Sequence, residues 1–527
     1  MTNSIEEIKN VGCLFIIGTN TTENHPVISL EMKEAVRAHG AKMIVADPRK
    51  IDLVDYADVW MSQKPGSDVA LINGMIHVII KEELHDKTFI AERTEDFDKL
   101  AAVVKAYTPD MVERITGVPA QDIEKAARLF AQAKTGAIFY AMGITQHTTG
   151  VDNVKALANL AMVTGNVGKE NAGVNPLRGQ NNVQGACDMG ALPNVFPGYQ
   201  LVTDENVRKK FEAAWGVTLD SKVGLTIMEM MNGAIEGKVK AMFILGEDPL
   251  TSDPNVSHVK EAIENLDFLV VQDLFLTEVA KHADVILPGV SFAEKEGTFT
   301  NTERRVQRVR EAIKPRGSAR PDWKIFLELF KRMGAKQSCT TPEKIMKEIA
   351  GVTPQYGGIT YKRIEREGIL WPCPDKNHPG TKYLHKDRFT RGKGLFFPIE
   401  FIDPKELPDA EYPHILTTGR VLYHWHGGNM SRRSKGLMAI YPEGLVEMNP
   451  QDVEAVGCKE GDMVSVESRR GKVTGKLKVT KKSPPGVIFM TFHFPDVLTN
   501  LLTNDALDPI AKIPEYKVCA VKVQKAS

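Results

Sequence analysis

Short runs of apolar residues alternate with helical stretches in the first part of the chain. Three such runs cover Cys13–Ile17, Lys42–Ala46 and Ala57–Met61, and each is followed by glycine, proline or polar residues. A run bounded in this way is typical of a parallel strand that is buried on both faces. A helical pattern from Pro26 to about His39 separates the first two runs. This alternation predicts an α/β fold.

The same order of strands recurs in a later part of the chain. The second set of apolar runs covers Ala241–Leu245, Phe268–Val271 and Ala283–Leu287. In both sets the first strand leads to glycine, Gly18 or Gly246. The second strand leads to aspartate, Asp47 or Asp273, roughly 28 residues further on. Both third strands contain Ala-Asp-Val and lead to Pro-Gly, so we predict two related Rossmann-like α/β units.

Glycine and aspartate at the ends of these strands indicate a ligand. In parallel sheets a ligand lies outside the carboxyl ends of the strands. A glycine there lets the backbone approach a phosphate, and an aspartate can bind a ribose hydroxyl or a guanine edge. Two units therefore predict two nucleotide-like ligands, or one large ligand with two arms. Asp47 and Asp273 would alternatively only cap helices, and the absence of GxGxxG argues against an ordinary NAD site.

A long polar stretch from Asn175 to Gly190 lies between the two units. Its apolar residues follow neither a helical nor a strand period, and it concentrates amides and glycines around a single cation, Arg178. We predict a loop that presents side-chain amides and backbone N–H groups. Loops held by a rigid scaffold often carry function, so a binding site is expected here rather than a plain surface turn.

The C-terminal part of the chain changes character. Residues from about 353 to 394 are rich in Pro, Gly, Lys and His and indicate a long surface connection, whereas later residues form short apolar runs broken by turns. These runs predict a small β-barrel. Its polar cluster contains Arg420, His424 and His426, and the two histidines are spaced for one face of a strand. No carboxylate or cysteine lies nearby in sequence to complete a metal site, so phosphate or pterin contacts are expected instead.

Composition excludes several classes of function. The formal net charge is +0, so nothing indicates a nucleic-acid or anionic-membrane partner. No run of about 18 apolar residues predicts a membrane span, and the first residues do not resemble a signal peptide. The six cysteines are scattered without a CxxC pair, which argues against a metal or cluster motif within these residues. It favours a reducing compartment, and we expect a cytoplasmic protein, with a periplasmic one still open.

Several motifs together resemble the catalytic α subunit of formate dehydrogenases, in the molybdopterin oxidoreductase family. They are NPLRGQNNVQGACDMG from Asn175, ADPRK from Ala46, GEDPL from Gly246, QDLFLTEVAKHADVILPG from Gln272, EKEGTFTNTERRVQ from Glu294 and PEYKVCAV from Pro514. The resemblance covers the whole chain. It implies four parts: a first α/β unit (1–180), a second (181–292), a remnant of the family's N-terminal domain with a connecting segment (293–400) and a double-psi barrel (401–527).

The resemblance implies a bis-(molybdopterin guanine dinucleotide) cofactor carrying Mo or W, which would supply the two arms. The first unit would hold one arm through Gly18, Asn20, Glu23, Asp47, Arg49, Gly66, Asp68, Gly143 and Gln146. The second would hold the other through Gly246, Asp248, Ser252, Gln272, Asp273, Gly289 and Asp322. The barrel would cap the cofactor through Arg420, His424, His426, Asn500, Tyr516 and Lys517. Arg178 would pair with the formate carboxylate in two hydrogen bonds, with Gln180 beside it.

The chain also departs from the family pattern. Full-length members carry a four-cysteine [4Fe-4S] domain and a Cys or selenocysteine metal ligand followed by His, and none of these occurs here. We therefore expect the cluster in a missing N-terminal part or a partner chain. A reading frame interrupted at selenocysteine and a true split gene would both produce such a chain.

The implied reaction is oxidation of formate to CO2, or its reverse, with electrons leaving through an Fe–S partner. On this interpretation the polypeptide alone would be inactive. Two alternatives stay open: another bis-pterin oxidoreductase with a different substrate, and a non-catalytic or split cofactor-binding subunit.

Overall fold

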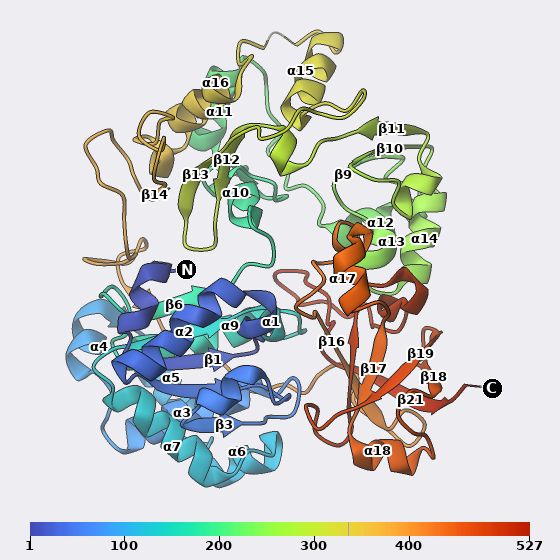
Figure 1. The fold of residues 1–527 in the computed structure, drawn as a ribbon. Coiled ribbons are helices and arrows are strands. Elements are labelled where there is room, and N and C mark those ends of the chain that lie inside the picture. Colours follow the sequence, from blue (N-terminus) through green and yellow to red (C-terminus); the bar gives the residue numbers. More distant parts are fainter. Residues whose placement is uncertain (336, 527) are drawn as a thin grey trace. The chain divides into compact units, whose positions relative to one another are not determined.

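The computed structural model of the protein describes residues 1–335 and 337–526. The chain divides into two compact units, whose elements are labelled in Figure 1. The first unit consists of residues 1–179, 251–256 and 383–527, and the second of residues 180–250 and 257–382. None of the helices in the described residues is both long and apolar enough to cross a membrane. The four-part division proposed from the sequence stays a prediction.

The first unit contains a parallel sheet of five strands in the order β3-β2-β1-β5-β6. The apolar runs predicted as strands are strands, because their side chains are buried on both faces of the sheet. The strands are β1 (Cys13–Ile17), β2 (Lys42–Ala46), β3 (Val59–Met61), β5 (Gly136–Tyr140) and β6 (Gly173–Pro176).

Helices and loops cover both faces of this sheet. Phe15 and Ile17 of β1 belong to one core cluster, and the alternate residues Leu14 and Ile16 belong to another. The predicted helix from Pro26 is present and contributes Met32 to the second cluster. The helices are α1 (Thr21–Asn24), α2 (Pro26–His39), α3 (Asp68–Lys81), α4 (Lys87–Arg93), α5 (Phe97–Val104), α6 (Pro109–Thr116), α7 (Ala120–Gln132), α8 (Met142–Thr145) and α9 (Gly150–Val163).

The C-terminal part of the first unit is a closed six-stranded β-barrel, in the order β16-β20-β17-β19-β18-β21. Its interior is apolar and includes Leu416, Val446 and Ile488. The predicted small barrel is thus confirmed. Its elements are β16 (His414–Gly419), α17 (Lys435–Ile440), β17 (Leu445–Met448), α18 (Pro450–Ala455), β18 (Met463–Glu467), β19 (Lys472–Val479), β20 (Val487–Thr491) and β21 (Cys519–Lys525), and a short pair, β4 (Thr94–Glu95) with β15 (Gly394–Leu395), precedes it.

The second unit contains a parallel sheet of three strands in the order β11-β10-β9. This is the order of β3-β2-β1 in the first unit, so the repeated strand pattern of the sequence is present in the fold. The strands are β9 (Ala241–Leu245), β10 (Phe268–Asp273) and β11 (Val285–Pro288).

The rest of the second unit combines helices with small antiparallel pairs. The helix predicted from Asp322 is α15. The elements are α10 (Val183–Asp188), β7 (Val195–Phe196), β8 (Gln200–Leu201), α11 (Glu205–Trp215), α12 (Ile227–Ile235), α13 (Pro249–Ser252), α14 (Val256–Glu264), β12 (Gly297–Thr300), β13 (Arg305–Val309), α15 (Asp322–Arg332), α16 (Pro342–Val352) and β14 (Ile369–Leu370), of which α13 and α14 cross the boundary between the units.

Candidate cofactor and substrate site

Two glycines bring strand ends together where the strand order of the first sheet reverses. β2 lies on one side of β1 and β5 on the other, and ligands bind at such reversals. Gly18 follows β1 with a φ of 56°, and the Gly143 amide donates to its carbonyl at 3.0 Å. A Cβ on Gly143 would lie 2.4 Å from that same oxygen. The two backbones can therefore meet only because neither residue has a side chain.

The segment from Thr19 to His25, which follows Gly18, presents buried polar atoms that no described residue satisfies. The side-chain oxygens of Asn20 and Asn24 are two of them. The orientation of the Asn24 amide is fixed because its Nδ2 donates to the Asn20 carbonyl at 2.9 Å, so the orphaned atom is a hydrogen-bond acceptor. Glu23 forms an ion pair with Lys482 at 3.5 Å. Buried polar atoms almost always have partners, so this segment fits a polar ligand.

Two carboxylates lie near the ends of β2 and β3. Burial raises the pKa of Asp47 to about 6 and the pKa of Asp68 to about 7. Gln63 donates to Asp68 at 3.1 Å, and its own Oε1 is buried without a partner among the described residues. A buried carboxylate is costly unless donors surround it. Asp68 therefore suits a ligand edge that presents N–H groups.

Two further candidates in this region have packing roles in the structure. A Cβ on Gly66, which has a φ of 85°, would lie 2.3 Å from the ring of Pro404. The guanidinium of Arg49 lies 2.5 Å from the Glu447 carboxylate and 3.4 Å from the centre of the Phe489 ring. These contacts join the α/β part of the first unit to its barrel part, and they occupy the Arg49 guanidinium.

A buried histidine lies directly after Gln146, which ends α8. The Nε2 of His147 lies 2.8 Å from the Gly143 carbonyl, so this nitrogen carries the hydrogen. Burial lowers the pKa of His147 to about 4, and the neutral ring leaves Nδ1 as a bare acceptor. That atom is buried without a hydrogen-bond partner among the described residues, and Glu515 approaches it to 3.9 Å. Like Gln63, it fits a ligand that donates.

The main chain at Arg178, shortly after β6, is held from three sides. The Nε2 of His25 lies 2.7 Å from the Arg178 carbonyl, and an Nη of Arg420 lies 3.3 Å from the Gly179 carbonyl. A Cβ on Gly179 would lie 3.0 Å from two ring atoms of His426. The first unit thus fixes the backbone that carries the Arg178 guanidinium, whereas Gln180 begins the second unit.

Lys517 is a buried cation in the barrel part of the first unit, and Arg420 is a half-buried cation in the same part. The Nζ of Lys517 donates to the Thr418 carbonyl at 2.6 Å, and burial lowers its pKa to about 7. Burial also lowers the pKa of Arg420 to about 10. The hydrogen bonds of both side chains within the described residues go to backbone carbonyls. Cations of this kind suit an anionic ligand such as a phosphate.

The two histidines predicted beside Arg420 differ in what they can bind. His424 uses both ring nitrogens within the barrel, at 3.1 Å from the Ser431 hydroxyl and 2.7 Å from the Tyr441 carbonyl. The Nε2 of His426 is buried without a partner among the described residues. The described residues contain no group of three His, Cys, Asp or Glu side chains that could hold a metal ion.

A third histidine holds this loop in place. The Val421 amide donates to Nε2 of His493 at 3.1 Å, so the hydrogen of the neutral ring is on Nδ1, which donates to the His426 carbonyl. His426 has a φ of 45°, in the left-handed region that only a few per cent of non-glycine residues adopt. His493 therefore supports a strained backbone.

The loops that carry Asn500, Tyr516 and Lys517 are pinned to the barrel and to the 251–256 segment. Asn500 donates from Nδ2 to the carbonyls of Thr251 and Ser252 at 2.9 and 3.0 Å, which leaves its buried Oδ1 as an acceptor. The Tyr516 hydroxyl donates to Ser252 at 3.2 Å.

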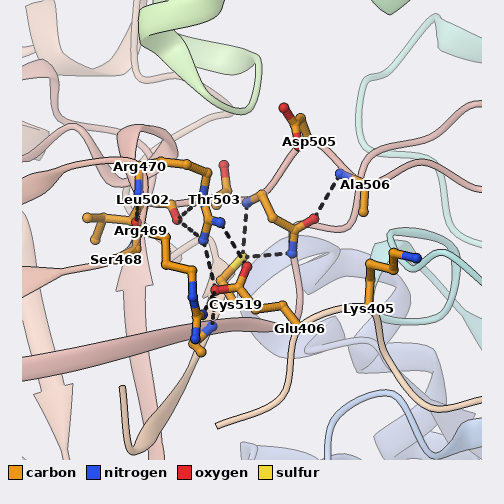
Figure 2. Close-up of polar contacts among 12 residues, drawn as sticks. Lys405, Glu406, Ser468, Arg469, Arg470, Leu502, Thr503, Asp505, Ala506 and Cys519 are labelled. Carbon is orange, nitrogen blue, oxygen red and sulfur yellow. Dashed lines mark hydrogen bonds and ion pairs between the residues drawn. The ribbon is translucent and has the colours of Figure 1, made fainter. Parts of the chain in front are cut away.

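A network of polar contacts, drawn in Figure 2, holds the residues that flank these loops. Arg470 lies 2.9 Å from the Glu406 carboxylate and donates to the Leu502 carbonyl at 3.0 and 3.1 Å. The amide of Asn504 donates to the Cys519 sulfur at 3.3 Å, which ties the two loops together. Burial raises the pKa of the Cys519 thiol to about 12, so it acts as a neutral packing group.

Some of the predicted residues of the second unit have free space or an unpartnered atom, and others already accept hydrogen bonds from the backbone. Gly246, after β9, has a φ of 62°, and a Cβ added to it would meet no atom within 4 Å, whereas a Cβ on Gly289 would meet none closer than 3.6 Å. Gln272 donates to Asp322 at 2.8 Å and keeps a buried Oε1 without a partner among the described residues. Asp248 accepts the amides of Glu278 and Val279, and Asp273 accepts those of Leu274 and Phe275.

Five residues of the first unit contact the predicted site residues or each other in the structure but were not predicted from the sequence: His25, Gln63, His147, His493 and Glu515. Gln63 and His147 follow β3 and β5, so the rule that polar groups after parallel strands bind ligands would have included them. The roles of the other three depend on contacts between residues far apart in sequence, which no local pattern carries.

Comparison with known proteins identifies the family. A family model described as Molybdopterin oxidoreductase matches residues 1–332, and one described as Molydopterin dinucleotide binding domain matches residues 415–520. The chain belongs to the molybdopterin oxidoreductase family. Its relatives include the F420-dependent formate dehydrogenase subunit alpha of Methanocaldococcus jannaschii, which is 53% identical over 100% of this chain and 78% of the relative.

A second relative and a solved structure agree with this assignment. Formate dehydrogenase H of Escherichia coli is 43% identical over 99% of this chain and 74% of its own length. Acetylene hydratase from Pelobacter acetylenicus has the same fold, with a TM-score of 0.77 and 22% identity over 99% of this chain and 79% of that chain. The predicted resemblance to formate dehydrogenase α subunits is confirmed along the whole chain.

Proposed function

We propose that this molybdopterin oxidoreductase chain binds formate and a bis-(molybdopterin guanine dinucleotide) cofactor and acts in a formate dehydrogenase. The reaction converts formate to CO2, one proton and two electrons, or runs in reverse. Homology to formate dehydrogenase α subunits over the whole chain is the observation that carries the proposal. When bound, the cofactor with its Mo or W supplies the two-electron chemistry, and the protein supplies binding and orientation.

The first unit fits one arm of this cofactor. Asp68, Gln63 and His147 present buried acceptors, which match the N–H groups on the edge of a guanine or a pterin. Arg420 and Lys517 present positive charge, which matches the pyrophosphate. Hydrogen-bond acceptors and cations in one unit fit a dinucleotide, which carries both N–H groups and phosphates, better than they fit a simple phosphate. We assign supporting contacts to Gly18, Asn20, Glu23, Asp47, Gly143, Gln146, His426, Asn500 and Tyr516.

The second unit fits the other arm less completely. Gly246 leaves space next to the backbone in a left-handed turn, where a phosphate can approach. The buried Oε1 of Gln272 and the neighbouring Asp322 offer acceptors to a heterocycle. We assign Asp248, Asp273 and Gly289 to the same arm, through backbone groups as well as side chains, and Ser252, which belongs to the first unit, stays a predicted cofactor contact. Both units would then be Rossmann-like, and the barrel would be of the double-psi type.

Arg178 would bind the carboxylate of formate, with Gln180 as a second polar contact. A guanidinium matches a carboxylate with two parallel hydrogen bonds, which fixes the direction of the formate C–H bond. Because the Arg178 backbone is held by His25 and Arg420, the substrate would be oriented rather than merely attracted. Positive charge at this position also favours the anionic substrate over neutral CO2.

We further propose that the [4Fe-4S] cluster and the protein ligand of the metal are supplied by polypeptide outside these 527 residues. The cysteines are scattered, and none of the six, all of which lie in the described residues, forms a disulfide. The relatives are longer than the chain, which covers 78% and 74% of them. The partner would be an Fe–S electron-transfer subunit or an N-terminal segment. Free cysteines favour a cytoplasmic location.

Chemical analysis of the purified holoenzyme tests the proposed function. The complex that contains this chain would be isolated, denatured and analysed for guanine nucleotide, pterin and metal by mass spectrometry. We expect two guanine nucleotides for each Mo or W and for each copy of the chain, together with formate-dependent reduction of a viologen dye. A single guanine per metal would contradict the two-arm assignment, and absence of both guanine and pterin would overturn the function.

A further inference from the structure

His25 occupies an unusual position between two helices. It directly precedes Pro26, the first residue of α2, but its side chain makes no hydrogen bond to the start of that helix. The Nε2 of the ring instead lies 2.7 Å from the carbonyl of Arg178, a residue 153 positions further along the chain that follows β6. Helix starts are usually capped by Ser, Thr, Asp or Asn, and here the position carries a histidine whose hydrogen bond goes to a distant backbone group.

The hydrogen-bond partners fix the chemical form of the ring. A carbonyl oxygen only accepts, so Nε2 of His25 must carry the hydrogen. Burial and the nearby charge of Arg420 lower the pKa of His25 to about 4, so the ring is neutral and Nδ1 has no hydrogen. Nδ1 is buried, and no described residue donates to it. His25 therefore keeps a buried acceptor that a donor on a bound ligand would satisfy.

The neighbouring atoms have the same character. The orphaned oxygen of Asn24 is an acceptor, because the amide nitrogen of that residue is already used. The hydroxyls of Thr19 and Thr21 are also buried without partners among the described residues, but a hydroxyl can donate or accept and does not distinguish between ligands. Phosphate oxygens only accept and would leave the Asn24 oxygen and the His25 Nδ1 unsatisfied, whereas a guanine or pterin edge donates through ring N–H and amino groups. The ligand of this segment is therefore an N–H-bearing heterocycle.

The Nε2 side of the His25 ring holds the backbone of Arg178, the proposed formate-binding arginine. The carbonyls of Arg178 and Gly179 are held by His25 and Arg420, and the His426 ring blocks movement at Gly179. Rotation of the His25 ring would release one of these contacts. A donor on Nδ1 would prevent that rotation, because it fixes the plane of the imidazole.

We propose that His25 couples the bound cofactor to the substrate arginine: its Nδ1 accepts an N–H of the cofactor's heterocycle while its Nε2–H fixes the Arg178 carbonyl. This inference rests on the proposed function, and His25 acts as a positioning residue. Binding of the heterocycle would thereby order the formate-binding guanidinium.

Two substitutions separate the two contacts. In His25→Asn the amide oxygen takes the place of Nδ1, and the contact to Arg178 is lost. In His25→Gln the amide nitrogen takes the place of Nε2, and the acceptor at Nδ1 is lost. His39→Asn and His39→Gln are matched controls, because His39 is an exposed histidine at the end of the same helix. All four variants would be made in the holoenzyme, and their melting temperatures measured.

We expect His25→Asn to keep its guanine nucleotide and pterin, to raise the formate KM roughly tenfold with a smaller change in kcat, and to exchange amide hydrogens faster in the peptide 175–182. His25→Gln should lose cofactor several-fold while its remaining loaded fraction binds formate normally. An unchanged formate KM and exchange rate in His25→Asn, or full cofactor content in His25→Gln, would overturn the coupling. Wild-type holoenzyme without guanine or pterin would instead overturn the proposed function.

Discussion

Asp58 and Asp284 make the same two-way backbone contact in different units of the chain. The Asp58 carboxylate accepts the amide of Met43 at 3.0 Å, and the Asp284 carboxylate accepts the amide of Leu269 at 2.7 Å. The amide of each aspartate donates back to the carbonyl of the same partner, at 2.8 and 2.9 Å. The repeated Ala-Asp-Val of the sequence thus marks a clamp between neighbouring strands, and these two aspartates serve the fold rather than a ligand.

Removing either clamp should destabilise the protein without removing the cofactor. We expect Asp58→Ala and Asp284→Ala each to lower the free energy of unfolding by about 1–2 kcal/mol, because a partly buried amide loses its acceptor. Urea unfolding followed by circular dichroism would measure the change. Asp55→Ala is a suitable control, since that carboxylate is 69% exposed. Equal stability of Asp284→Ala and wild type would contradict a structural role for the repeat.

The strands of both sheets could be predicted from the sequence because each is a short apolar run bounded by turn residues, which is a local signal. A parallel strand buried on both faces must be apolar throughout, and Cys13–Ile17 meets that condition in five consecutive residues. β9 and β11 of the second sheet are equally apolar, although most of their residues are exposed in this structure. The polar groups after the strands could be placed for the same reason. The packing roles of Gly66 and Arg49 could not, because Pro404 and Glu447 lie far along the chain.

The sequence indicates where polar side chains lie better than it indicates which of their atoms are free to bind a ligand. His424 and His426 look equivalent in the sequence. Of these two, His426 has a buried ring nitrogen without a partner among the described residues, whereas both nitrogens of His424 have partners. The difference arises from Ser431 and Tyr441, which fold back onto His424. His25 carries no signal of its role, because a histidine before Pro26 looks like an ordinary helix start.

Substitution of Arg178 should affect formate rather than the cofactor. We expect Arg178→Lys to raise the formate KM roughly 10–100-fold, because an ammonium cannot make two parallel hydrogen bonds to a carboxylate. Arg178→Ala should raise the formate KM further, because it removes the positive charge as well. Guanine and metal content should equal that of wild type, and Arg128→Lys on the surface of α7 is the control. Loss of cofactor from Arg178→Lys would assign this arginine to cofactor binding instead.

Asp68 should make the stability of the cofactor-free chain depend on pH. Burial raises its folded-state pKa to about 7, above an unfolded value near 4. The folded state therefore binds more protons, and stability is lost as the pH rises from about 4 to about 7. Asp68→Asn has no carboxylate to ionise and so does not lose this stability. The difference in the free energy of unfolding between the variant and wild type should therefore grow from about pH 4 to about pH 7 and then stay level, at about 4 kcal/mol at most.

The same substitution should weaken cofactor retention, because an amide nitrogen opposes the N–H groups of a guanine. Urea unfolding at several pH values and guanine analysis of the holoenzyme would measure both effects. A pH-independent stability difference would show that Asp68 is already ionised in the cofactor-free protein.

The buried pair of Arg49 and Glu447 should hold the barrel part to the α/β part of the first unit. Their side chains are only 10% and 5% exposed. Glu447 also lies 3.1 Å from the Lys478 ammonium, so Glu447→Gln leaves the Arg49 charge uncompensated, whereas Arg49→Met leaves Glu447 with its lysine partner. We expect Glu447→Gln to cost about 3 kcal/mol, Arg49→Met to cost less, and the double variant to cost less than the sum. Lys87→Met at the exposed pair with Glu83 should cost under about 0.5 kcal/mol. Strict additivity of the two buried substitutions would contradict the pairing.

Gly18 and Gly246 occupy matching places in the two units, yet alanine should affect them differently. Both glycines have a left-handed φ, of 56° and 62°. A Cβ on Gly18 would lie 2.8 Å from the Gly143 backbone, whereas a Cβ on Gly246 would meet nothing within 4 Å. Gly18→Ala should therefore fail to fold or lose several kcal/mol, because backbone cannot give way. Gly246→Ala should lose only about 1 kcal/mol of stability, from the strained φ.

The open space at Gly246 nevertheless matters if a phosphate lies against it. A methyl group there would keep the ligand from the backbone, so Gly246→Ala should fold and melt nearly as wild type but retain about one guanine nucleotide per chain instead of two. Gly237→Ala is a matched control, because that glycine also has a left-handed φ of 69° and open surroundings. Because it lies before β9 rather than after it, its alanine variant should keep both nucleotides. Full guanine content in Gly246→Ala would place the second arm away from the end of β9.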